Sequence, residues 1–138
     1  MRASSELERF IRDTLGCGCP DEVFDSVTVG RGLLGTDGDR VAWWIEVGGR
    51  LLIAVTEDDG TARLADRLGA IYASATLRRD TAGFNRFRLV VVNAPGTDTS
   101  PLEQAFAPIG ADDDRLHLHI VVPTDLPPLA ATTDTESP

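Results

Sequence analysis

The spacing of apolar residues predicts three main helices. Apolar side chains recur every three or four positions over residues 5–15 and 61–77, which is the spacing of one face of a helix. Ser5 with Glu8 forms a capping pattern at the start of the first helix, and the same pattern in "SPLE" (100–103) predicts a short third helix ending near residue 108. A further short helical turn is expected after Cys19, in "PDEVF" (20–24).

Five other runs are rich in β-branched and aromatic residues and predict strands. They cover residues 26–29, 41–47, 50–56, 87–94 and 115–122. The fourth run is almost continuously apolar, which is typical of a strand buried on both faces. Helices between the last strands require parallel crossovers. We therefore expect an α/β fold, with one mixed five-strand sheet in the order α-β-β-β-α-β-α-β and helices on both faces.

The second and third strands are separated by Gly48-Gly49, a two-residue hairpin signal. This turn predicts that Ile45 pairs with Leu52, with Trp43 and Trp44 on opposite faces. Both faces of the hairpin are apolar and must be covered. Because the expected helices are few, the pattern predicts a homodimer that buries the Trp43/Trp44 hairpin between two copies.

The chain predicts one domain, over residues 4–122, followed by a disordered tail over 123–138 that is rich in Pro, Thr and acidic residues. The element order over about residues 5–92 resembles the core of the PD-(D/E)xK nuclease superfamily, also called restriction-endonuclease-like. Asp37 or Asp39 could stand for the first acid of that family, but "RLLIAVTE" has no acid-x-Lys. The resemblance therefore implies the family's core without its catalytic motif.

Charge and composition exclude several classes of function. The net charge is −9, so the overall field repels nucleic acid and anionic lipid. All 13 basic residues are arginine, which excludes Schiff-base and Walker-type lysine chemistry within this chain. No apolar run is long enough to span a membrane and no signal-peptide core is present, so a cytoplasmic location is expected.

Cys17 and Cys19 are the most specific candidate pair in the sequence. A reducing compartment leaves such thiols free or metal-bound. They could bind zinc or iron, with His117 and His119 as further ligands, because two histidines at this spacing share one face of a strand. They could instead form a thiol-redox couple, with Cys19 activated at the N-cap of the short helical turn. The third interpretation is two small buried residues.

Two other groups of charged residues are candidate sites. Arginines flank the start of the fourth strand and could bind an anion or pair with the many acids: Arg78, Arg79, Arg86 and Arg88. Acids follow the third strand at the edge where α/β proteins usually bind ligands, and could hold a hard cation or cap a helix: Glu57, Asp58 and Asp59.

The sequence thus predicts a small α/β protein with a Cys-x-Cys metal or redox site. The alternative is a non-enzymatic homodimeric interaction module with structural cysteines. No substrate or reaction can be assigned from the residues.

Overall fold

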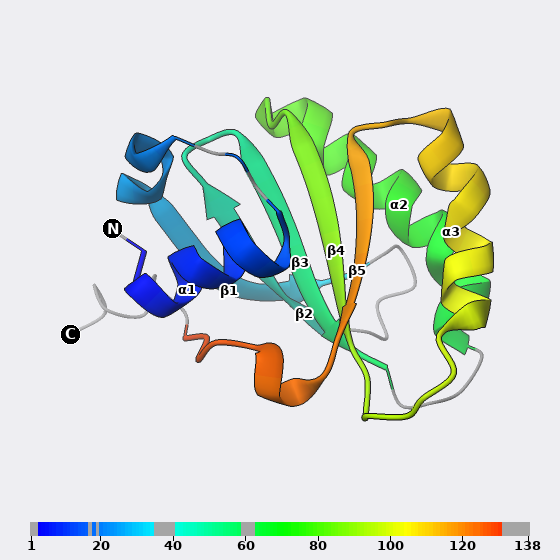
Figure 1. Ribbon diagram of the computed structural model, residues 1–138. Helices are drawn as coiled ribbons and strands as arrows, with labels where there is room; N and C mark the ends of the chain where they lie inside the picture. Colours follow the sequence, from blue (N-terminus) through cyan, green and yellow to red (C-terminus); the bar gives the residue numbers. More distant parts are fainter. Residues whose placement is uncertain (1–2, 17, 19, 35–40, 59–62, 131–138) are drawn as a thin grey trace.

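The chain forms one mixed five-strand sheet, as predicted. The computed structural model describes residues 3–16, 18, 20–34, 41–58 and 63–130. The strands lie side by side in chain order (Figure 1): β1 (Val27–Leu33), β2 (Val41–Val47), β3 (Leu51–Glu57), β4 (Arg86–Val92) and β5 (Leu116–Val121). β1, β2 and β3 are antiparallel neighbours, whereas β3, β4 and β5 are parallel.

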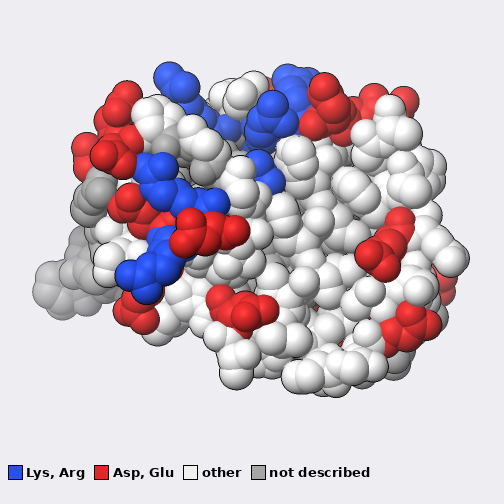
Figure 2. Space-filling view, in the orientation of Figure 1, with Lys and Arg blue, Asp and Glu red and all other residues white. Residues whose placement is uncertain are grey.

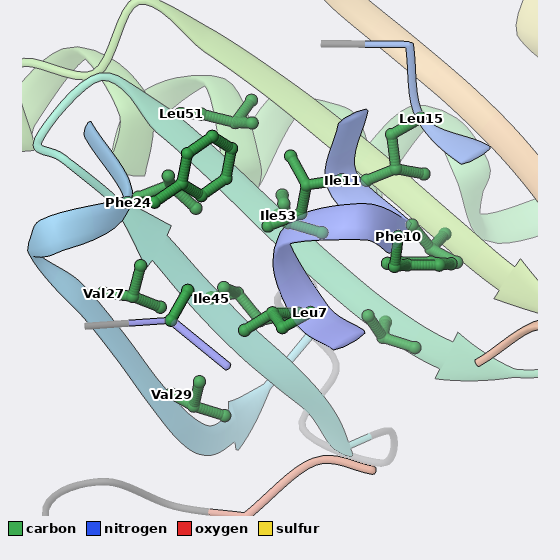
Figure 3. Packing of buried hydrophobic residues seen from close by; sticks show 14 of the residues in the cluster. Leu7, Phe10, Ile11, Leu15, Phe24, Val27, Val29, Ile45, Leu51 and Ile53 are labelled. Atoms are coloured by element: carbon green, nitrogen blue, oxygen red, sulfur yellow. The ribbon is translucent and has the colours of Figure 1, made fainter. Parts of the chain in front are cut away.

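The N-terminal segment covers one face of the sheet. It contains α1 (Ser5–Arg9), the π-helical turn η1 (Phe10–Thr14) and the 3-10 turn η2 (Asp21–Asp25). Its apolar side chains pack onto those of the sheet, as Figure 3 shows for Leu7, Ile11 and Phe24 above Ile45 and Ile53. The positive φ of Gly16 ends the helical segment, as predicted.

Two longer helices cover the opposite face. They are α2 (Arg63–Ala82) and α3 (Ser100–Asp112), which lie on that face in Figure 1. Their apolar side chains belong to one buried cluster with Leu52, Leu89 and Val91. Both faces of β3 and β4 are therefore buried, which explains their nearly continuous apolar sequence. The prediction of an α/β fold with helices on both faces is confirmed.

The register of the β2–β3 hairpin differs from the prediction. Ile45 pairs with Ile53, not Leu52, because the turn contains Arg50 as well as the two glycines. Gly48 and Gly49 both have positive φ, and the amide of Arg50 donates to Val47 O at 3.0 Å. The added residue shifts every cross-strand pair by one position.

Several element boundaries also differ from those predicted. The N-cap of α1 is Ser4, whose Oγ accepts from the amide of Leu7, and α2 and α3 each run several residues past their expected ends. Residue Pro20, not Cys19, precedes the first helical residue of η2. That position removes the N-cap argument for an activated Cys19.

The part of the predicted tail that the structure describes follows β5 along the first face. Pro123–Asp125 form the 3-10 turn η3, and Leu126 and Leu129 pack against the core beneath α1. Residues 131–138 lie outside the described part. Among the described helices, none is long and apolar enough to cross a membrane.

Candidate functional site

Two arginine–histidine pairs lie side by side on β4 and β5. Arg86 and Arg88 point to the same face of the sheet as His117 and His119, because residues two apart in a strand share a face. Nη1 of Arg86 lies 3.1 Å from Nε2 of His117, and Nη1 of Arg88 lies 3.0 Å from Nε2 of His119. A guanidinium can only donate, so both imidazoles accept through Nε2 and carry their proton on Nδ1.

Burial and positive charge keep both histidines neutral. The pKa of His117 is lowered by burial and by the charges of Arg88 and Arg86, against a smaller opposing effect of Asp114 and Asp113. Burial, followed by the charge of Arg88 and by His117, lowers the pKa of His119 to about 4. At neutral pH the pairs therefore carry the arginine charges alone.

Arg88 is the more buried of the two arginines in these arginine–histidine pairs. The residue is only 9% exposed. Its Nη1 donates to the carbonyl of Leu15 at 2.8 Å as well as to His119, whereas its Nε has no hydrogen-bond partner among the described residues. Burial and the neighbouring charge of Arg86 lower the Arg88 pKa, which shows that its charge is poorly compensated.

Arg88 lines a pocket of about 280 Å³ at the amino ends of β3 and β4. The pocket lies on the face covered by the N-terminal segment, between the β2–β3 turn and η2. Its remaining lining residues are Gly18, Pro20, Val23, Val47, Arg50, Leu51, Asn85 and Arg86. The amides of Asn85 and Arg86 both donate to the carbonyl of Arg50, which fixes the turn beside the start of β4.

Three arginines line the charged side of the pocket: Arg50, Arg86 and Arg88. Within the described part of the chain, no carboxylate forms an ion pair with Arg50, Arg86 or Arg88. Figure 2 shows basic side chains at the upper edge of the molecule, over the amino ends of the parallel strands, with acidic side chains along the same edge. The chain as a whole has 22 acidic and 13 basic residues, so acids outnumber the cations with which they could pair.

The other two candidate arginines do pair with acids and lie elsewhere. Arg78 contacts Glu46 at 3.6 Å and stacks over the ring of Trp44, on the α2 face of the sheet. Arg79, only 1% exposed, joins Asp80 at 3.0 Å and Asp113 at 3.1 Å. Arg78 and Arg79 thus lie on α2 and form ion pairs with acids, whereas Arg86 and Arg88 lie on β4 at the pocket.

The acidic candidates lie at the opposite, carboxyl edge of the parallel strands. Glu57 ends β3, and Asp58 accepts a hydrogen bond from Nδ2 of Asn93 at 3.2 Å. Oδ1 of the buried Asn93 has no hydrogen-bond partner among the described residues. Asp59 lies outside the described part of the chain.

The candidate cysteines, Cys17 and Cys19, also lie outside the described residues. Gly18, which separates them in the sequence, lines the Arg88 pocket. In the described part of the chain, no group of three or more potential ligands (His, Cys, Asp or Glu) could hold a metal ion. His117 and His119 already use Nε2 to accept from arginines, so they would ligate a metal through Nδ1 or after losing those contacts.

Sequence reasoning missed Arg50 and the apolar half of the pocket. Arg50 lies in a turn, and only the packing of η2 against that turn makes it part of a cavity. One signal was present in the sequence: Arg86 and Arg88, like His117 and His119, are two positions apart in otherwise apolar strands. Parallel pairing of those strands aligns the two polar pairs.

Comparisons with known proteins reveal no relative. No protein-family model, curated protein or solved structure matches this chain. The likeness to the PD-(D/E)xK nucleases thus rests on element order alone, which does not carry function. Function must be argued from the site itself.

Proposed function

We propose that the protein binds a small anion in the Arg88 pocket. The observation that carries this proposal is a buried guanidinium, at the edge of a cavity, with an unused donor and no carboxylate partner in the described part of the chain. An uncompensated buried cation costs folding free energy. An anion that binds Arg88 would remove part of that cost.

The surroundings of Arg88 suit an anion better than a cation. Arg50 and Arg86 add two exposed positive charges at the pocket, and the amide side chain of Asn85 adds a neutral hydrogen-bonding group. Guanidinium groups bind carboxylate and phosphate oxygens through pairs of parallel hydrogen bonds. The neutral histidines accept from Nη1, which leaves other N–H groups of the arginines for the ligand.

Calorimetric titration with phenyl phosphate at low ionic strength tests the proposal. We expect saturable binding that weakens as salt is added, because the attraction is electrostatic. Arg88→Met should weaken binding at least about tenfold, the effect of losing one charged hydrogen bond. Arg78→Gln is the matched control, since Arg78 lies on the other face of the sheet and should bind like the wild type.

Arg50→Gln provides a second variant that is safe for folding, since Arg50 is exposed. It should also weaken phenyl phosphate binding, by severalfold. The proposal is wrong if the wild-type protein shows no saturable binding of phenyl phosphate or inorganic phosphate. It is equally wrong if folded Arg88→Met and Arg50→Gln bind as tightly as Arg78→Gln.

We also propose that Cys17 and Cys19 provide metal-binding or thiol-redox chemistry. The support is the sequence itself, in which a single glycine separates the two thiols and lets the backbone direct both sulfurs to one point. Elemental analysis of the wild type against Cys17→Ser and Cys19→Ser would detect zinc or iron ligation. Iodoacetamide alkylation against pH would detect a thiol of lowered pKa.

The homodimeric interaction module and the cytoplasmic location stay predictions. Within one chain Trp44, Ile45, Leu52 and Ile53 are buried, whereas Trp43 is half-buried. Sedimentation equilibrium at micromolar concentration would detect a dimer through the Trp43/Trp44 hairpin. A mass near 14.8 kDa at every concentration would show a monomer.

A further inference from the structure

We infer that the ligand of the Arg88 pocket is an organic anion, with one oxyanion group and a compact apolar body. This inference rests on the anion-binding function proposed above. It names the chemical class of the ligand, and it predicts that the pocket binds an organic anion more tightly than an inorganic one.

The pocket has one charged side and one apolar side. The arginines and Asn85 come from the β2–β3 turn and from the start of β4, whereas the apolar residues come from η2, β2 and β3: Val23, Val47 and Leu51. Val47 and Leu51 are 0% and 4% exposed and belong to the core of the N-terminal face. Their surfaces at the pocket cannot offer hydrogen bonds to a ligand.

The two sides are in direct contact. Leu51 of β3 is the register partner of Arg86 of β4, so their side chains are neighbours on one face of the sheet. A ligand that reaches the buried Arg88 can therefore also lie against Leu51. Charge recognition and apolar contact occur within a single cavity.

The size of the cavity excludes a good fit for a bare inorganic oxyanion. Its volume of about 280 Å³ lies near the lower end of the range for small-molecule sites. One water molecule has a share of about 30 Å³ in the liquid. A tetrahedral ion of five heavy atoms would leave much of this space to water held against apolar walls, and any of its oxygens that face those walls would lose hydration without gaining a hydrogen bond.

An organic anion avoids both losses. Its oxyanion group can pair with the guanidinium groups while its apolar body covers the exposed parts of Val23 and Leu51 and displaces the water there. A ring or a short branched chain has a suitable size. Phenyl phosphate and inorganic phosphate form a matched pair of probes, because they share the oxyanion and differ in the apolar body.

We expect phenyl phosphate to bind at least about tenfold more tightly than inorganic phosphate, from the apolar area that the ring removes from water. Benzoate should likewise bind more tightly than acetate. Calorimetric titration of the full chain at one ionic strength measures all four. Equal affinities within each pair overturn the inference but leave anion binding intact, whereas no binding of any probe overturns anion binding itself.

Val23→Thr provides a variant that acts on the apolar side alone. Threonine has nearly the shape of valine, but its hydroxyl places a polar group on the wall of the pocket. We expect this variant to lower phenyl phosphate affinity severalfold and to leave inorganic phosphate affinity unchanged. If both affinities fall together, or neither falls, the ring does not lie against Val23 and the assigned orientation is wrong.

Discussion

The guanidinium of Arg88 donates to Nε2 of His119 across the β4–β5 pair, and this contact keeps the imidazole neutral in the folded chain. Protonation of Nε2 would remove the acceptor and place two positive charges about 3 Å apart. Folding therefore opposes protonation of His119. The contact links a residue of the pocket to the pH dependence of stability.

We predict that His119 makes the protein less stable as the pH falls from about 6.5 to about 4. The His119 pKa is about 4 in the folded chain, against an ordinary value of about 6.5. Between these values the unfolded chain binds a proton that the folded chain does not, so the free energy of unfolding rises with pH. Allowing for its partial exposure, His119 should contribute about 1–2 kcal/mol to this change.

Urea unfolding at pH 7, 5.5 and 4.5 measures this contribution. His119→Gln is the informative variant, because its amide oxygen can still accept from Arg88 and cannot be protonated in this range. Its stability should fall less than that of the wild type between pH 7 and pH 4.5. Identical pH dependence in the two proteins would contradict the prediction.

A second prediction concerns Gly48, where the β2–β3 turn meets η2. Its φ is +59°, and a Cβ built there would lie 2.6 Å from Cβ of Val23. Gly48→Ala should cost about 3 kcal/mol or more, from backbone strain of about 1 kcal/mol together with the clash. Because Val23 lines the pocket, the variant should also weaken phenyl phosphate binding.

Gly49→Ala separates strain from clash. Gly49 has a similar φ of +67°, but nothing lies within 4 Å of its added Cβ. We expect a loss of only about 1–2 kcal/mol, with no change in binding. If thermal or urea unfolding shows equal losses of unfolding free energy for the two variants, then Val23 of η2 does not clash with an alanine at position 48.

A third prediction concerns the buried cation at the end of α2. Arg79 is compensated by Asp80 and Asp113, and Asp113 also accepts from the amide of Arg115. Asp113→Ala should cost about 2–4 kcal/mol, because it leaves a buried guanidinium with one partner. Asp114→Ala, at the exposed adjacent position, should change the free energy of unfolding by less than about 0.5 kcal/mol. Similar losses would argue against this role for Asp113.

The arrangement of the sheet could be predicted from the sequence because each strand carries a local signal. Apolar runs, turn glycines and intervening helices were enough to give five strands, the mixed sheet and both covered faces. The hairpin register was not predictable from Gly48 and Gly49 alone. Arg50 could belong to the turn or to β3. Its position depends on its carbonyl, which accepts hydrogen bonds from the amides of Asn85 and Arg86, 35 and 36 positions later in the chain.

The pocket could be predicted only in part. The two-residue spacing of Arg86 and Arg88 marked polar positions on an apolar strand, and these residues were candidates for anion binding. The sequence did not show that Arg86 and Arg88 lie apart from Arg78 and Arg79, because this depends on where α2 ends. Local helix propensity places the ends of helices poorly. The contact of Arg88 with Leu15 joins residues 73 positions apart, so no local pattern contains it.

The strand order of the sheet has a consequence for folding. Because β1 to β5 lie side by side in chain order, each strand pairs with the one preceding it, and no pairing requires the chain to pass over an intermediate strand. The sheet can therefore grow by one strand at a time, first through short hairpin loops and then through the two helical crossovers, whose closure costs more entropy. β5 is the last strand to be synthesised, and it forms the edge of the sheet next to β4. Since β5 carries both histidines, the second crossover brings to Arg86 and Arg88 the imidazoles that accept their hydrogen bonds in the folded chain.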